Sequence, residues 1–163
     1  MGARPLTVAV DASPLIGLAK IRKLRLLAKL YPVVVIPPAV YADVVVRGAG
    51  RAGARAVQQA VAEGWIQVVT PADPARVPPS LHGTGEGEVI ALVLCRQADV
   101  AIVDDRKARN LCTLLGIRHI STGMVLKDAA SQGLIRDLAK TLNRLQQKGF
   151  GISDYAQLIE DTD

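Results

Sequence analysis

Residues 6–20 read LTVAVDASPLIGLAK, and this stretch decides the fold. Leu6–Val10 is an apolar run of the length of one buried strand, and it stops at Asp11. The Ser13-Pro14 pair then predicts the start of a helix, because serine suits the cap and proline suits the first helical position. We therefore expect a carboxylate and a hydroxyl at the carboxyl end of the first strand, the edge where open α/β sheets bind ligands.

The rest of the chain repeats this alternation of short apolar runs and helical patterns. Further strands are expected at residues 33–36, 65–69, 99–103 and 117–120. Helices are expected at residues 14–30 (one, or two with a break near Lys23), 39–46, 51–63, 86–97, 107–115, 123–132 and 134–148. The alternation predicts an α/β fold with a mainly parallel central sheet and helices on both faces. We expect one domain over residues 1–150, with a polar loop at 70–85 that could act as a flap, and a C-terminal tail at 151–163.

Composition restricts the class of protein. Half of the 163 residues are apolar but only 3% are aromatic, so we expect a core of Val, Leu, Ile and Ala. No apolar run reaches the ~18 residues of a membrane span, and the N-terminus lacks the features of a secretory signal. Cys95 and Cys112 lie far apart in helical patterns and are expected to be reduced core residues. These features favour a cytoplasmic protein without a membrane partner.

The net charge of +5 favours a polyanionic partner. The chain has no aromatic RNA-recognition motif, no zinc-ligand spacing and no phosphate loop, so a bound nucleic acid would be held by its backbone charge. The candidate nucleic-acid contacts are Lys20, Arg22, Lys23 and Arg25. The alternative is that these cations form the solvated face of a helix.

Acidic residues recur where a strand gives way to a helix. They are Asp11, Asp43, Glu86, Glu88, Asp104 and Asp105. If the strands are parallel, their carboxyl ends share one edge of the sheet and these side chains meet there. Crowded carboxylates resist ionisation unless a cation lies among them, and Mg²⁺ or Mn²⁺ prefers such oxygen ligands. A bound metal of this kind can lower the pKa of a water molecule and orient it towards a phosphodiester.

Each acidic residue also has a purely structural interpretation. Asp11 would cap the first helix, and Glu86 and Glu88 would complement the positive end of a helix dipole. Because Glu86 and Glu88 are two residues apart they do not face the same way, so only one is expected to reach the site. The Asp104-Asp105 pair would form an ion bridge with a following arginine. The shared position at strand ends favours the metal site.

Four short motifs, in this order, resemble the PIN-domain superfamily. They are DASPLI at residues 11–16, IPPAVYADV at 36–44, GEGEVIAL at 85–92 and AIVDDRKAR at 101–109. The resemblance extends over nearly the whole chain and is to a prokaryotic PIN-like group of toxin-type ribonucleases. It implies a three-layer α/β/α fold with a central parallel sheet. It also implies a metal-dependent ribonuclease that acts on RNA and is often the toxin of a toxin–antitoxin pair.

The resemblance assigns roles by position. The implied catalytic acids are Asp11, Asp43, Glu86 and Asp105. The implied Mg²⁺ or Mn²⁺ ligands are these four and Asp104, and the implied supporting residues are Ser13, Glu88 and Arg106. An antitoxin protein and a second copy of the chain are the partners that proteins of this kind often have.

Three positions depart from the pattern of the superfamily. Asp43 stands where a Glu is usual, and Glu86 stands where an Asp is usual, so the reach of both side chains to a metal differs. Val103 replaces a hydroxyl residue. A catalytically weak or inactive nucleic-acid-binding module, regulated by a protein partner, is therefore the alternative to the ribonuclease. A receiver-like phosphate-handling domain also clusters acids at strand ends, but we identify no equivalent of its phosphorylatable Asp and nearby Lys.

Overall fold

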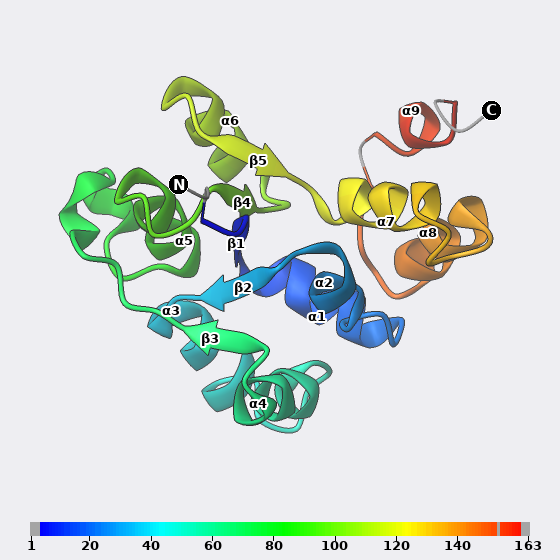
Figure 1. The fold of residues 1–163 in the computed structure, drawn as a ribbon, viewed down its shortest axis with the longest axis horizontal. Coiled ribbons are helices and arrows are strands. Elements are labelled where there is room, and N and C mark those ends of the chain that lie inside the picture. Colours follow the sequence, from blue (N-terminus) through cyan, green and yellow to red (C-terminus); the bar gives the residue numbers. More distant parts are fainter. Residues whose placement is uncertain (1–3, 153, 161–163) are drawn as a thin grey trace.

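The computed structural model describes residues 4–152 and 154–160, which fold around a five-stranded parallel sheet with helices on both faces (Figure 1). The strands are β1 (Thr7–Val10), β2 (Val33–Ile36), β3 (Ile66–Val68), β4 (Val100–Ile102) and β5 (Arg118–Ile120). They lie in the order β3-β2-β1-β4-β5, and every neighbouring pair is parallel. The expected three-layer α/β/α fold with a parallel central sheet is confirmed.

Before residue 150, the helices lie close to the positions that their patterns predict. They are α1 (Ala12–Lys20), α2 (Leu26–Leu30), α3 (Pro38–Tyr41), α4 (Ala54–Glu63), α5 (Gly85–Leu94), α6 (Arg106–Leu114), α7 (Thr122–Ser131), α8 (Leu138–Gln147) and α9 (Tyr155–Glu160). The predicted helix at 39–46 is divided, because α3 continues as a π-helical turn, η1 (Ala42–Val46). The loop before α5 carries two 3₁₀ turns, η2 (Pro74–Arg76) and η3 (Pro79–Leu81).

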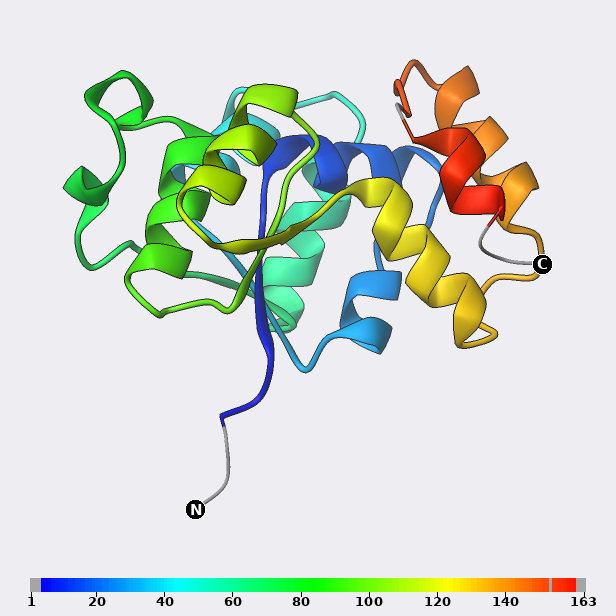
Figure 2. The ribbon, with the colours of Figure 1, turned by 90° about the horizontal axis from the view of Figure 1, so that it is seen from above.

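The cap of α1 corrects one prediction. Asp11, not Ser13, is the N-cap: its backbone is extended and its side chain accepts a hydrogen bond from the amide of Ala12 at 2.8 Å. Asp is as good a cap as Ser, and Pro14 fits the first turn as well, because amides there have no partner within the helix. The Ser13 hydroxyl is therefore available to another group. Figure 2 shows α1 beginning directly at the carboxyl end of β1.

The C-terminal segment expected as a tail contains α9. Its Leu158 is 2% exposed and lies over Gly123 of α7, whose missing side chain leaves room for it. The predicted domain boundary at residue 150 stays a prediction, and so does the role of the 70–85 loop as a flap.

The order of the strands places one crevice at the centre of the sheet. From β1 the chain passes to β2 and β3 on one side, and then to β4 and β5 on the other. The strand order therefore reverses between β1 and β4, and ligands bind at such points in open α/β sheets. The Asp11 amide, just after β1, donates to the carbonyl of Ile102 in β4 at 3.0 Å. Asp104 follows β4 at the same edge.

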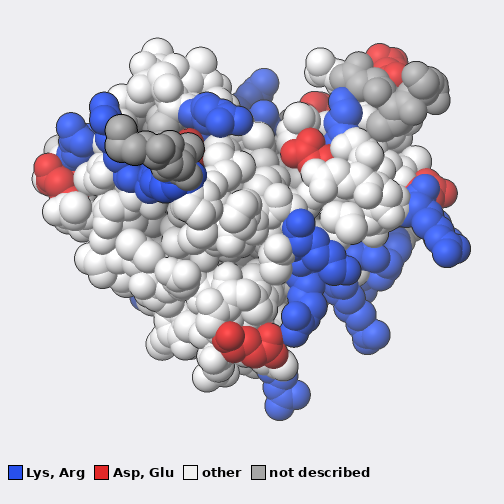
Figure 3. Space-filling view, viewed as in Figure 1, with Lys and Arg blue, Asp and Glu red and all other residues white. Residues whose placement is uncertain are grey.

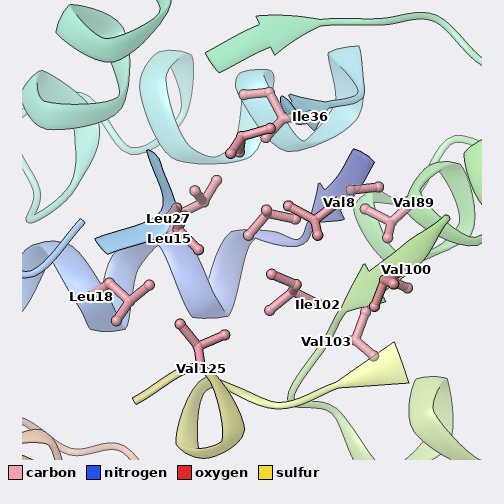
Figure 4. Packing of buried hydrophobic residues seen from close by; sticks show 14 of the residues in the cluster. Val8, Leu15, Leu18, Leu27, Ile36, Val89, Val100, Ile102, Val103 and Val125 are labelled. Atoms are coloured by element: carbon pink, nitrogen blue, oxygen red, sulfur yellow. The ribbon is translucent and has the colours of Figure 1, made fainter. Parts of the chain in front are cut away.

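The core consists of aliphatic side chains from both helical layers and the sheet. Figure 4 shows Val8 of β1, Leu15 of α1, Val89 of α5, Ile102 of β4 and Val125 of α7 in this core, and all five are fully buried. The central strands read as continuous apolar runs because helices cover both of their faces.

Cys112 lies in α6, whereas Cys95 is the C-cap of α5. Cys112 is buried in the core, Cys95 is half-buried, and neither takes part in a disulfide. Of the helices in the described ranges, none has the length and apolar character needed to cross a membrane.

Candidate metal centre

Asp11 and Asp43 face a common space over Gly85, the first residue of α5. Asp11 is 7% exposed. A methyl group at Gly85 would lie 3.1 Å from Oδ1 of Asp11 and 3.2 Å from Oδ2 of Asp43. Because this residue is a glycine, its own side chain does not enter the space between the two carboxylates, which Cγ2 of Val40 also borders, at 3.2 Å from the same methyl position. The space is therefore a candidate cradle for a cation.

Asp43 lies on the π-helical turn η1, a type of irregularity that is frequent at functional sites. Its Oδ1 pairs with the guanidinium of Arg47, which donates from Nη2 and, at 3.1 Å, from Nε. Both side chains of this pair are exposed, at 39% and 66%. The second oxygen, Oδ2, is left on the side of Gly85.

Three donors orient the carboxylate of Asp104. The amide of Thr122 donates to Oδ1 at 2.8 Å, and the Thr122 hydroxyl donates to Oδ2 at 2.6 Å. The Ser13 hydroxyl donates to Oδ2 at 3.2 Å. Residues from the starts of α1 and α7 thus hold the side chain that follows β4.

Asp105 caps α6, since its Oδ2 accepts a hydrogen bond from the amide of Ala108 at 3.0 Å. Within the described residues, neither Asp104 nor Asp105 forms the alternative ion bridge with Arg106 or Arg109. Asp105 is exposed at the same edge of the sheet, and its charge acts on Glu86.

Glu86 and Glu88 both lie in the first turn of α5 but have different neighbours. The pKa of Glu86 is raised, first by partial burial and then by the charges of Asp105 and Asp43. Glu88 accepts a hydrogen bond from the amide of Ala39 at 3.0 Å, which holds the start of α3. Glu86 therefore belongs with the other acids, whereas Glu88 holds the segment that carries Asp43.

We call Asp11, Asp43, Glu86, Asp104 and Asp105 the acidic cluster. The pKa of Asp11 is raised from 3.8 to about 6, mainly because the side chain is buried. The charges of Glu86, Asp104 and Asp43 act in the same direction, against the hydrogen bond from Ala12. Burial and like charges both favour the protonated carboxyl, so a bound cation would restore the ionised form.

A hard divalent cation fits the chemistry and the space of the acidic cluster. All of its donors are carboxylate oxygens, which Mg²⁺ and Mn²⁺ prefer, and Gly85 leaves a space between two of them. As they stand, no three acidic, histidine or cysteine side chains among residues 4–152 and 154–160 form a ready cation-binding group. Binding would therefore require side chains of the cluster to rotate towards one another.

Comparison with known families agrees with this arrangement. Residues 7–160 match the profile of a family described as a PIN domain. The chain belongs to the PIN-domain family. PIN domains are generally nucleases and typically use divalent metal ions. No curated protein and no solved structure matched the chain.

The basic residues expected to contact RNA lie at the other end of α1 from the acidic cluster of this PIN domain. Lys20 donates to the carbonyl of Lys148 at 3.4 Å and lies over the ring of Phe150. Arg22 is exposed, Lys23 is half-buried, and Arg25 pairs with Glu63 at 2.8 Å. Lys20 lies nine positions after Asp11 along α1, which is about 13 Å of helical rise.

Arginines that sequence reasoning treated as secondary lie beside the acidic cluster of the PIN domain. An open pocket of about 900 Å³ adjoins Asp104 and is lined by Arg106 and Arg109. Among the described residues, the buried Nε of Arg109 has no hydrogen-bond partner. The pocket thus places cationic groups next to carboxylates.

Sequence reasoning missed Gly85, Thr122 and Arg47. Gly85 is the first residue of the GEGE motif at 85–88, and the sequence does not show that a carboxylate from another element lies against it. The spacing of Arg47 from Asp43 is a regular helical pair, so this contact was readable from the sequence. Thr122 follows β5 and meets Asp104 only in the folded chain.

Proposed function

We propose that this PIN domain is a Mg²⁺- or Mn²⁺-dependent endoribonuclease that hydrolyses RNA phosphodiester bonds. The observation that carries the proposal is the convergence of Asp11 and Asp43 on the space over Gly85. A buried carboxylate with a raised pKa, close to other acids and at the crevice of a parallel sheet, is typical of a functional site.

Asp11, Glu86 and Asp105 would hold the metal. Asp43 would complete this set of ligands or accept a proton from water. The metal would lower the pKa of that water and orient it for attack on phosphorus. Asp104, oriented by Thr122 and Ser13, would complete the negative edge of the site. Arg106 and Arg109 line the adjoining pocket and would attract the phosphate.

Cleavage of a fluorophore-quencher RNA tests this proposal, with Mn²⁺, with Mg²⁺ and with EDTA. Asp11→Asn and Asp105→Asn are suitable variants, because Asn caps a helix as well as Asp does and only the charge is lost. The matched control is Asp137→Asn, since Asp137 caps α8 through the amide of Lys140 and is not part of the acidic cluster. We expect metal-dependent cleavage by the wild type and the control, and its loss in both cluster variants. Equal cleavage by all four proteins, or cleavage in EDTA, would refute the proposal.

A second candidate is a catalytically weak or inactive RNA-binding module. The Asp43–Arg47 pair and the lack of a ready three-ligand group among the described residues favour it. Metal binding and RNA binding without cleavage by the wild type would establish this candidate.

The biological setting rests on the family resemblance alone. We propose a cytoplasmic toxin that a dedicated antitoxin protein inhibits, with a homodimer as the assembled form. Growth arrest on expression, relieved by Asp11→Asn, supports the toxin role, and a monomer in sedimentation would rule out the homodimer.

A further inference from the structure

A second functional surface lies at the end of α1 remote from the acidic cluster. It is an open groove of about 620 Å³ between that end of α1, the start of α4 and the chain just after α8. Its cations are Lys20, Arg22, Arg51, Arg55 and Lys148, and none of the described residues that line it is acidic. Figure 3 shows Lys and Arg side chains gathered on the side of the molecule where Figure 1 places α1 and α2. We call this surface the cationic groove.

Close packing between α1 and α4 builds the groove. Gly53, the N-cap of α4, has a φ of +94°. A methyl group on Gly53 would lie only 3.4 Å from the Cα of Ile16 in α1. This approach brings Arg51 and Arg55 beside the end of α1. Lys20 is held there by the Lys148 carbonyl and lies 5.5 Å from the centroid of the Phe150 ring.

Arg22 occupies a backbone position that normally belongs to glycine. Its φ is +57°, and it follows the last turn of α1, where the Lys23 amide donates to the Leu18 carbonyl at 2.8 Å. Glycine is usual at this point of a helix end, and a residue with a side chain costs roughly 1–2 kcal/mol there. Arg96 has a similar φ of +58° at the end of α5, so this backbone form belongs to the helix end, and what Arg22 adds to the groove is its exposed positive charge.

We propose that the cationic groove binds the phosphodiester backbone of RNA. The floor of the groove consists of small residues, among them Ala19, Ala52 and Ala56. Its described lining includes no aromatic ring on which a base could stack, and none of the large exposed apolar residues in the described part of the chain lies there. A protein partner would require apolar or aromatic anchors, whereas a polyanion of regular charge requires only cations.

The position of the groove relates it to the acidic cluster. Lys20 lies about 13 Å along α1 from Asp11, and a stacked strand rises about 3.4 Å per nucleotide. About four nucleotides would therefore connect the two surfaces. The inference rests on the proposed RNA substrate, and it assigns the groove the role of holding the strand a few nucleotides from the site of cleavage.

Fluorescence anisotropy in EDTA tests the groove without any contribution from cleavage. The probe is a labelled single-stranded RNA of twelve nucleotides, titrated with the full chain at 50 and 200 mM KCl. The test variant is Arg51→Ala/Arg55→Ala, and the matched control is Arg136→Ala/Lys140→Ala, which removes two exposed cations elsewhere. Each contact to a single-stranded phosphate contributes about 0.7 to the slope of log affinity against log salt concentration. If the variant loses two contacts, the fold-loss of affinity between 50 and 200 mM KCl should be about sevenfold smaller than in the wild type.

We expect weaker binding and this smaller salt effect in the test variant, and wild-type behaviour in the control. Equal effects of the two double variants would overturn the proposal, because general charge would then explain binding. Competition by polyglutamate as strong as by unlabelled RNA would also overturn it, in favour of an acidic protein partner. Groove-dependent binding without metal-dependent cleavage would support the groove while refuting the ribonuclease, so the two failures are distinct.

Discussion

Arg47 pairs with Asp43 across one turn of helix, so that one carboxylate oxygen meets a guanidinium while the other faces Gly85. A cation of the protein thus competes with a metal for one oxygen of the acidic cluster. Both partners are exposed, and exposed pairs of this kind contribute at most about 1 kcal/mol to stability. A divalent ion can therefore displace Arg47 at small cost.

Replacement of Arg47 tests this competition. We expect Arg47→Gln to raise the affinity for Mn²⁺ several-fold and to change the free energy of unfolding by less than about 1 kcal/mol. Calorimetric titration measures the affinity. The control is Arg25→Gln, which breaks the comparable Arg25–Glu63 pair remote from the acidic cluster and should leave Mn²⁺ affinity unchanged. An unchanged affinity in Arg47→Gln would show that the pair does not compete with the metal.

The raised pKa of Asp11 makes stability depend on pH. Because the folded protein holds the proton more tightly than the unfolded chain, the cost of ionising Asp11 is absent below pH 3.8, grows as pH rises, and is complete above about pH 6. The shift corresponds to about 3 kcal/mol. We expect Asp11→Asn, which can keep the hydrogen bond from Ala12, to be more stable than the wild type at pH 8 in EDTA by up to that amount. At pH 4 the two proteins should be nearly equal in urea denaturation. A constant difference between pH 4 and pH 8 would contradict the account.

Substitutions at two glycines of α5 distinguish an effect on metal binding from an effect on the stability of the fold. Gly85→Ala would place a methyl group between the carboxylates of Asp11 and Asp43, with its nearest contact at 3.1 Å. We therefore expect at least a tenfold loss of Mn²⁺ affinity and a smaller loss of stability than in Gly87→Ala. In Gly87→Ala the new methyl group would lie 2.0 Å from the Leu81 carbonyl oxygen, which should cost about 1–3 kcal/mol of stability. Thermal unfolding and metal titration on both variants check this. Equal metal affinity in Gly85→Ala and the wild type would show that the space is not the metal site.

The hydrogen bonds that Asp104 accepts differ in length and burial, so their removal should lower the stability of the fold by different amounts. Thr122→Val removes a 2.6 Å bond from a residue that is 3% exposed, so we expect a loss of about 1.5–3 kcal/mol in the free energy of unfolding. Ser13→Ala removes a 3.2 Å bond from a half-buried residue and should cost less. Chemical denaturation gives both values. A larger loss in Ser13→Ala than in Thr122→Val would show that Thr122 is not the main support of Asp104.

The sheet was predictable because its strands are short apolar runs with clear ends. VVVI at 33–36 is β2 to the residue, since Pro37 cannot continue a ladder. The parallel arrangement follows from the helices between the strands, and it brings the strand-end acids to one edge. The cap of α1 was mispredicted because Asp11 and Ser13 are equally good caps two residues apart, and local sequence does not rank them.

Contacts between distant segments leave no periodic pattern in the sequence, so they could not be predicted from it. The bond from Thr122 to Asp104 joins the ends of β4 and β5, and it depends on how two helices begin. The cationic groove combines the end of α1 with Arg51, Arg55 and Lys148, whose proximity exists only after α4 and α8 pack. The basic run at residues 20–25 indicated one wall of that groove, but Arg25 of that run pairs with Glu63 instead.

Calorimetric titration of Mn²⁺ into the wild type and Asp11→Asn at pH 7.5 tests the central claim most directly. The claim is that the acidic cluster binds a divalent metal through Asp11. The account predicts saturable binding by the wild type and a loss of binding in the variant. Binding of equal strength in both proteins, or no binding by the wild type, would contradict it.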